Sequence, residues 1–189
     1  MKYLIDTCIF FHKLKNGQNI LDSCEKVIKN SDRNCISNVI LKELEEPIND
    51  VKNNNELHTI VKNTIYMFKR MDLIDTEESA NVRANLQKIR DRFYGWQKDT
   101  KYLQKLIAEG VLTREEIKAF GFRYKDMGEC SLIAIALTAP NEYTIVTEDK
   151  GKVYKFPSQN LFEVYNNVEV VNYDSWIGKV ENNEVEAKL

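Results

Sequence analysis

Short β-prone runs that alternate with helical segments are the feature that most limits how this chain can fold. Four such runs are visible, at residues 2–5, 34–36, 143–146 and 168–171. Each is too short to be read as a helix, and helical spacing of apolar residues fills most of the intervening sequence. Strands separated by helices predict a parallel sheet covered on both faces. We therefore expect an α/β fold.

The middle of the chain is helical in pattern. We expect a helix over residues 56–73 that places Leu73 on its inner side, and a second long helix that opens at Thr76. The spacing of Thr113 and Glu116 predicts a capping box at the start of a later helix. A chain of 189 residues suits a single domain. The sequence thus predicts one domain over residues 1–189, with a helical insertion at about 75–120 and a frayed polar end over the last nine residues.

Composition narrows the class of protein. The net charge of −2 excludes wholesale electrostatic attraction to nucleic acid, so any such binding needs a local basic patch. The four cysteines form no CxxC pair, and there are only two histidines, His12 and His58, so a structural zinc site is not expected. No apolar run approaches the roughly 18 residues of a membrane span, and no signal peptide is visible. We expect a cytoplasmic protein with no membrane contact.

Acidic residues follow the predicted strands or lie on helices next to them. Asp6 ends the first run and Asp149 lies just beyond the run at 143–146, while Glu43 and Glu129 lie on the neighbouring helices. Sites in open parallel sheets form beyond the carboxyl ends of the strands. If the first strand and the 143–146 strand are adjacent, these acids converge, and their mutual repulsion favours a hard divalent cation such as Mg²⁺ or Mn²⁺.

Four segments resemble, in order, the four motifs of the PIN-domain nuclease family. They are MKYLIDTCIFF at 1–11, ISNVILKEL at 36–44, DMGECSLIAIAL at 126–137 and TIVTEDK at 144–150. The resemblance covers both ends of the chain and leaves residues 50–120 largely unmatched. It implies a three-layer α/β/α fold with a central, mostly parallel sheet. It also implies a divalent-metal-dependent endoribonuclease that hydrolyses phosphodiester bonds of single-stranded RNA.

The same resemblance assigns residue roles. Asp6, Glu43, Glu129 and Asp149 would be the catalytic residues and the ligands of Mg²⁺ or Mn²⁺, with Thr147 orienting a carboxylate or a metal-bound water. The third motif of the family often has aspartate where this chain has Glu129, so Asp126 is an alternative ligand, unless it caps the helix. Glu148 competes with Asp149, although the Thr-x-Asp spacing favours Asp149.

A basic stretch at residues 83–105 carries seven Lys or Arg against two Asp, with aromatic residues between them. It predicts phosphate contacts from Arg90, Arg92 and Lys98, and Lys150 next to the fourth motif would add another. The alternative is a structural helix face. A further alternative is a protein interface for an antitoxin or a second copy, with Tyr94 and Trp96 as anchors.

The resemblance suggests the toxin of a toxin–antitoxin pair. The alternatives are an RNA-processing or defence nuclease, and a catalytically inactive PIN-like module that binds RNA or protein. An inactive module would be expected to lose acids, whereas this chain keeps the full set. Neither GxGxxG nor GxxxxGK[ST] occurs, which argues against a dinucleotide or P-loop site. Cys8 stands where the Asp-x-Asp loop of phosphatases has its second aspartate, so a phosphoaspartyl mechanism is not expected.

Overall fold

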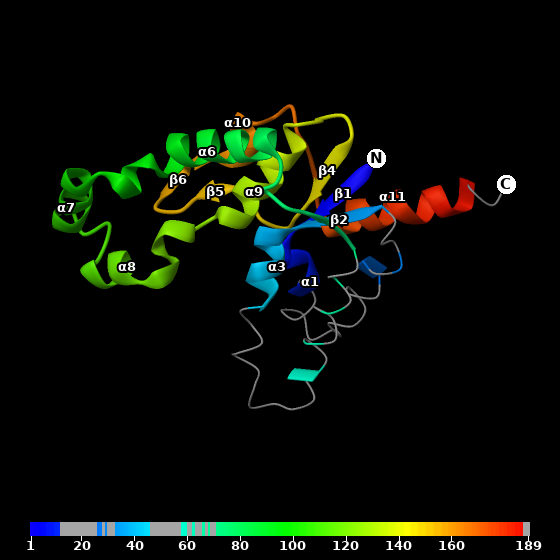
Figure 1. Cartoon of the computed structure of the whole chain (residues 1–189), viewed down its shortest axis with the longest axis horizontal. Coiled ribbons are helices and arrows are strands. Elements are labelled where there is room, and N and C mark those ends of the chain that lie inside the picture. Colours follow the sequence, from blue (N-terminus) through cyan, green and yellow to red (C-terminus); the bar gives the residue numbers. More distant parts are fainter. Residues whose placement is uncertain are drawn as a thin grey trace.

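The structure is a computed structural model (Figure 1). It describes residues 1–11, 33–45 and 71–186, together with the single positions 26, 27, 29, 58, 59, 62, 66 and 68. The fold, the site and every contact given below belong to these residues. His12 lies outside them, and so does most of the helix predicted over residues 56–73.

A five-stranded sheet forms the centre of the molecule, in the order β3-β2-β1-β4-β7. The strands are β1 (Lys2–Ile5), β2 (Asn34–Ser37), β3 (Asp72–Ile74), β4 (Tyr143–Val146) and β7 (Glu169–Val171). Every neighbouring pair in this sheet runs parallel. The parallel sheet predicted from the short apolar runs is confirmed.

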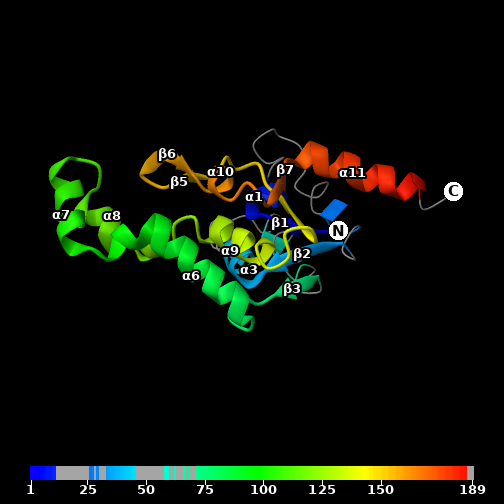
Figure 2. The same cartoon turned by 90° about the horizontal axis from the view of Figure 1, so that it is seen from above.

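Helices cover both faces of this sheet. Figures 1 and 2 show α3 (Asn38–Glu45), α6 (Ala80–Tyr94) and α9 (Met127–Ala136) on one side and α11 (Tyr173–Glu186) on the other. The short helices α1 (Thr7–Phe11) and α10 (Leu161–Val164) follow β1 and β6 along the chain. Together with the sheet these helices form the three-layer α/β/α architecture that the resemblance implied, and this part of the prediction is confirmed.

The main core lies between the sheet and its helices. Strand residues Leu4, Ile36 and Ile145 are fully buried, and α9 is buried along nearly its whole length. On α11, Trp176 is fully buried as well. A helix that is apolar on nearly all sides must be enclosed, which explains why α9 lies inside the core.

A second, smaller apolar cluster lies in what we call the helical arm, residues 95–125. The arm comprises η2 (Gly95–Lys98), α7 (Thr100–Ala108), α8 (Arg114–Lys118) and η3 (Phe120–Tyr124), and Figure 1 shows it projecting away from the sheet. The buried residues of this apolar cluster are Leu106, Leu112 and Phe122. The hairpin of β5 (Lys152–Val153) and β6 (Phe156–Asn160) contributes Phe156 to the same cluster.

Three local predictions were wrong. Residues 72–74, expected to end a helix, form edge strand β3, where the Asp72 carboxylate pairs with Lys2 on β1. Helix α6 begins at Ala80 with Ser79 as its cap, because the hydroxyl of Thr76 instead donates to Asn38 Oδ1 at 3.0 Å. Helix α11 continues to Glu186, beyond the predicted start of the frayed end. The capping box of Thr113 and Glu116 is confirmed.

Candidate active site

Strand register places Asp6 beside Thr147. Strands β1 and β4 are adjacent and parallel, and Ile5 pairs with Val146, the last residue of β4. Asp6 and Thr147 therefore leave the sheet side by side at its carboxyl edge, where the Asp6 amide still donates to Val146 O at 3.0 Å. The adjacency on which the convergence of the acids depended is confirmed.

Asp6 is buried, with 4% of its surface exposed, and its carboxylate accepts several hydrogen bonds. The Thr7 amide donates to Oδ1 at 2.7 Å, while the Thr147 hydroxyl and the Cys8 thiol donate to Oδ2. Burial raises the pKa of Asp6, and the charge of Asp149 raises it further, although these hydrogen bonds lower it. The side chain is fixed in place before any ligand arrives.

Glu43 reaches the same edge from α3. Its carboxylate accepts a hydrogen bond from the Thr7 hydroxyl at 2.8 Å, which joins it to the residue after Asp6. Gly128 on α9 makes room for it, because a Cβ there would lie 2.7 Å and 2.9 Å from the two Glu43 carboxylate oxygens. Ser37 fixes α3 by accepting from the Ile40 amide at 3.1 Å and contacting the Ser131 hydroxyl on α9 at 3.0 Å.

Glu129 completes a group of mutually interacting acids. It lies in the first turn of α9, and burial raises the pKa of its carboxyl to about 8. The negative charges of Asp6, Asp126 and Glu43 add to that increase. Like charges raise a carboxyl pKa only when they lie within about one Debye length of it and are poorly screened by solvent. Residues far apart in sequence thus form one acidic cluster.

Asp149 lies at the exposed rim of this cluster. Its amide donates to the Thr147 hydroxyl at 2.9 Å, and its Oδ1 accepts from the Gly151 amide at 2.6 Å. The neighbouring Glu148 is turned elsewhere, since its Oε1 accepts from the Tyr173 amide at the start of α11, at 2.8 Å. The Glu148 carboxylate thus contacts α11, whereas Asp149 contacts Thr147, whose hydroxyl donates to Asp6.

Asp126 occupies the N-cap position of α9 but does not cap the helix with its side chain. Its Oδ2 instead accepts from the Tyr94 hydroxyl and from the Tyr154 amide, the latter at 2.8 Å. Its backbone is left-handed, with φ of 55°. The capping interpretation is wrong, and Asp126 joins α6, α9 and the β5–β6 hairpin three residues before Glu129.

Cys8 was expected only to be a buried thiol. It is a free thiol, partly buried, and its sulfur also accepts from the Glu148 amide at 3.2 Å. Burial and the charge of Asp6 raise its pKa to about 12, so the thiol stays protonated and can donate to Asp6. Its place two residues after the strand-end aspartate is the signal that could have put it in the cluster.

The cluster offers oxygen ligands of the kind that Mg²⁺ and Mn²⁺ prefer. Within the described residues no group of three or more Asp, Glu, His or Cys side chains is already gathered tightly enough to hold a metal ion. Burial and neighbouring negative charge raise the pKa of Asp6 and Glu129, and a divalent cation would oppose that increase. The donor chemistry of these residues fits a divalent cation.

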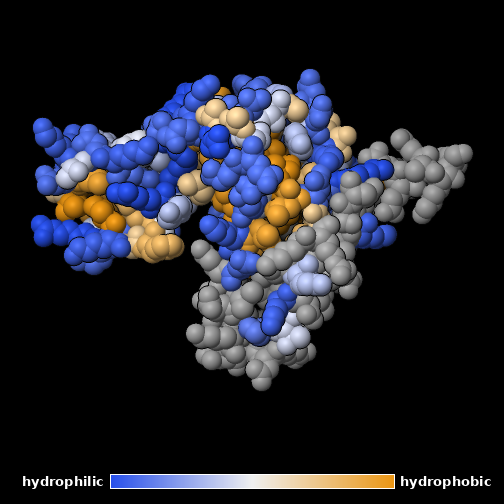
Figure 3. All heavy atoms as spheres, viewed as in Figure 1, coloured by the Kyte–Doolittle hydropathy of each residue, from blue (hydrophilic) through white to orange (hydrophobic). Residues whose placement is uncertain are grey.

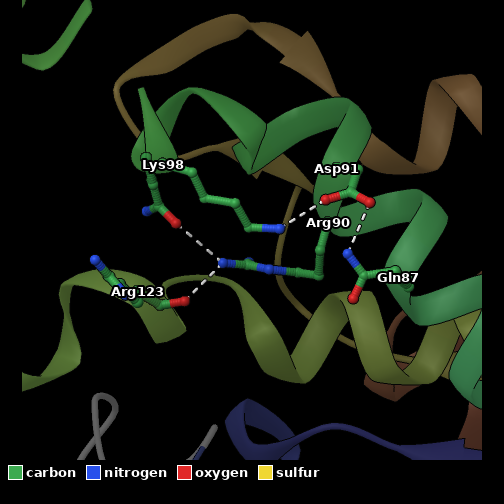
Figure 4. A network of polar contacts seen from close by, with 6 residues as sticks. Gln87, Arg90, Asp91, Lys98 and Arg123 are labelled. Atoms are coloured by element: carbon green, nitrogen blue, oxygen red, sulfur yellow. Dashed lines mark hydrogen bonds and ion pairs between the residues drawn. The ribbon is translucent and has the colours of Figure 1, made fainter. Parts of the chain in front are cut away.

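The basic residues predicted to contact substrate differ in their surroundings. The Arg90 guanidinium donates to Arg123 O, as Figure 4 shows. It also donates to Gln97 Oε1 at 3.2 Å and to Lys125 O at 2.6 Å. Lys98 pairs with Asp91 at 2.9 Å (Figure 4). The Arg92 guanidinium lies 5.3 Å from the centroid of the Phe93 ring. Lys150 is exposed next to Asp149.

The aromatic residues of the same stretch are not available to a partner as expected. Tyr94 exposes 2% of its surface, so the hypothesis that it anchors a protein interface is wrong. Trp96 packs edge-on against Phe122 and Phe156, with ring centroids 5.8 Å and 5.3 Å apart. Both rings serve to attach the arm to the rest of the molecule.

No helix within the described ranges combines the length and the apolar character needed to cross a bilayer.

Comparisons with known proteins add the following. No protein-family model matches the sequence, and no curated protein matches it. The fold is similar to that of VapBC2 from Rickettsia felis bound to a promoter DNA fragment, with 16% identity and a TM-score of 0.47. It is also similar to DNA-bound VapBC from Salmonella typhimurium, with 15% identity and a TM-score of 0.48. Each match covers 91% of this chain and 98% of the other, and we draw no functional conclusion from either.

Proposed function

We propose that this chain is a divalent-metal-dependent endoribonuclease that hydrolyses phosphodiester bonds of single-stranded RNA. The observation that carries the proposal is the acidic cluster, in which Asp6, Glu43 and Glu129 come from separate elements and interact at the carboxyl edge of the sheet. A buried cluster of one sign is costly without a compensating cation. The order of the motifs that supply these acids resembles that of PIN nucleases.

Asp6, Glu43, Glu129 and Asp149 would hold Mg²⁺ or Mn²⁺. A bound ion of this kind lowers the pKa of water and stabilises the charge that develops on a phosphodiester. The residues of the chain position the acids: Thr147 and Cys8 fix Asp6, Thr7 fixes Glu43, and Gly128 allows Glu43 to approach α9. Lys150, exposed beside Asp149, can contact a phosphate of the RNA. We leave Arg90 out of the substrate contacts because its guanidinium is bonded to carbonyls.

The decisive experiment is cleavage of a labelled single-stranded RNA. Wild-type protein should cleave it with Mg²⁺ or Mn²⁺, lose activity in excess EDTA, and leave DNA of the same sequence intact. Asp6→Asn should lower kcat/KM by at least about 100-fold, because metal-ion stabilisation contributes several kcal/mol to catalysis. Glu142→Gln, an exposed acid at the opposite end of β4, is the matched control and should keep full activity.

Cleavage that survives EDTA would remove the metal mechanism. Failure to cleave any RNA, with metal present and the protein folded, would favour the catalytically inactive binding module instead.

For the biological role we propose the toxin of a toxin–antitoxin pair, acting in the cytoplasm. The support is the motif resemblance, and the alternative is an RNA-processing or defence nuclease. Expression in bacteria should arrest growth with wild-type protein and not with Asp6→Asn, and co-expression of a small antitoxin encoded next to the gene should restore growth. Light scattering of the purified chain would show whether it forms a homodimer. Growth unaffected by active wild-type enzyme would support the alternative.

A further inference from the structure

The helical arm exposes two neighbouring aromatic rings. Phe120 exposes 90% of its surface and Tyr124 57%, and their ring centroids are 5.9 Å apart with the planes inclined by 36°. Both belong to η3, while Phe122 between them is buried at 3% in the small apolar cluster of the arm. The helix therefore turns one aromatic residue inward as its anchor and two outward.

Polar contacts hold this segment in one conformation. Arg90 on α6 donates to the carbonyls of Arg123 and Lys125, at 2.8 Å and 2.6 Å (Figure 4 draws the first). Gln97 donates to Phe122 O at 2.8 Å. A backbone that is already held in place loses little conformational entropy when a ligand binds to its side chains. The two exposed rings are thus presented on a prepared surface.

Basic side chains surround the ring pair. Arg114, Lys118, Arg123 and Lys125 are all exposed, and in the part of the chain that the structure describes none of them forms an ion pair. Of the two acids on α8, Glu116 is bound by Lys155 at 2.7 Å and Glu115 is exposed, so residues 114–125 carry four basic side chains against two acidic ones. Figure 3 shows apolar surface on the arm bordered by hydrophilic residues. The chain as a whole carries a net charge of −2, so this local positive region is a departure from its average.

The ring pair also lies close to the acidic cluster. Tyr124 precedes Glu129 by five residues. Consecutive Cα atoms are about 3.8 Å apart, so their Cα atoms are separated by at most about 19 Å. Between them, the Lys125 ammonium lies 5.6 Å from the centroid of the Tyr154 ring, and the Tyr154 amide binds Asp126. Positive charge therefore lies on the path from the rings to the acids.

We propose that Phe120 and Tyr124 form a stacking platform for unpaired bases of single-stranded RNA, with the basic residues around them neutralising its phosphates. The identity of the nucleic acid rests on the proposed function. Exposed aromatic rings combined with unpaired positive charge are the features by which proteins bind single strands without strong sequence preference. The five residues that separate Tyr124 from Glu129 keep the platform within about 19 Å of that acid.

Binding can be measured separately from cleavage, by fluorescence anisotropy of a labelled 12-nucleotide RNA in excess EDTA. Stacking contributes about 1–3 kcal/mol per base, which corresponds to roughly 5- to 150-fold in affinity. The double variant Phe120→Ala, Tyr124→Ala should therefore bind at least about tenfold more weakly. Replacing both residues with Trp should preserve affinity, whereas Leu at both positions should fail, since it keeps apolar area but has no π face. Binding of duplex RNA should not change.

Val164→Ala, at an exposed apolar residue outside the arm, is the control and should bind as wild type. Unchanged affinity in the double Ala variant would overturn the platform. Full affinity in the double Leu variant would overturn it as well, and would favour a protein as the partner of this surface. Circular dichroism confirms folding of each variant. RNA binding that depends on the rings without metal-dependent cleavage would contradict the proposed nuclease and leave the platform intact. Cleavage with an unchanged KM in the double Ala variant would contradict the platform alone.

Discussion

The acidic edge of the sheet buries negatively charged groups, whereas the helical arm exposes positively charged ones. At the edge, Asp6 is buried among other acids, and burial together with neighbouring negative charge raises the pKa of Glu129 to about 8. In the arm, basic side chains such as Lys118 and Arg123 stand in solvent. Buried charge of one sign requires a ligand, whereas exposed charge of the other sign can attract one from a distance. The difference suggests that the acidic edge carries out the chemistry and that the arm binds the substrate.

Of the four variants that follow, Thr147→Val should have the largest effect, which is a loss of RNA cleavage. The substitution keeps the shape of the side chain but removes the hydroxyl that donates to Asp6, and the loss of such supporting bonds typically costs 10- to 100-fold in metal affinity or activity. Thr144→Val, on the same strand and bonded to Glu169 instead, is the matched control and should retain activity. Steady-state RNA cleavage measures both. Equal rates in the two variants would show that Thr147 does not position the acid.

Gly128→Ala should lower activity by about tenfold with little change in stability. The new Cβ would lie under 3.0 Å from both carboxylate oxygens of Glu43, which is the end of a flexible side chain and can move away. Gly178→Ala on α11, where a Cβ would meet nothing within 4 Å, is the control. Cleavage assays and thermal unfolding should separate the two effects. Wild-type activity in Gly128→Ala would mean that the approach of Glu43 to α9 is not needed.

Arg90→Ala tests the arm rather than the edge. Hydrogen bonds from a charged donor contribute about 1.5–3 kcal/mol, and Arg90 donates to the carbonyls of Arg123 and Lys125. We expect faster hydrogen exchange in residues 95–125 and little change in the sheet. Lys88→Ala, two residues earlier at an exposed position of α6, is the control. If exchange rises equally in the sheet and the arm, the two regions unfold as one unit.

The smallest effect is a pH dependence of stability in metal-free protein. The pKa of Glu129 is about 8 in the folded chain and near 4.5 when unfolded, so the folded state binds the proton more tightly. Its favourable contribution is complete below about pH 4.5 and is lost as pH rises towards 8. Glu129→Gln should therefore raise Tm by a few degrees at pH 8 and leave it unchanged at pH 5, unlike Glu115→Gln at an exposed site. A Tm difference that does not vary with pH would contradict the burial of this acid.

Sequence patterns predicted the parts of the molecule that follow from strand period and from acids at strand ends. Strands at 2–5 and 143–146 were visible because their apolar runs stop at polar residues, and Asp6 and Thr147 then follow from register. Edge strand β3 was missed because its residues are largely exposed and its stability involves the distant pair Lys2–Asp72. The β5–β6 hairpin was missed because Phe156–Asn160 lacks apolar alternation.

Side-chain roles were harder to predict where they depend on long-range contacts with the backbone. A count of charges made Arg90 a candidate for phosphate binding, but its partners are carbonyls 33 and 35 residues further along the chain. Asp126 precedes a helix, as caps do, yet its carboxylate accepts from Tyr94 and Tyr154. Local patterns contain no information on such partners.

The most direct test of the acidic cluster is a titration with Mn²⁺, followed by isothermal calorimetry and electron paramagnetic resonance. We expect wild-type protein to bind Mn²⁺ at a saturable site that EDTA empties. Asp6→Asn, Glu43→Gln, Glu129→Gln and Asp149→Asn should each weaken it by at least about tenfold, because a neutral amide is a poorer ligand for a hard cation. Asp126→Asn should weaken it less, since Asp126 is bonded to Tyr94 and Tyr154. Mn²⁺ binding that persists unchanged in all four variants would contradict a metal site built from these acids.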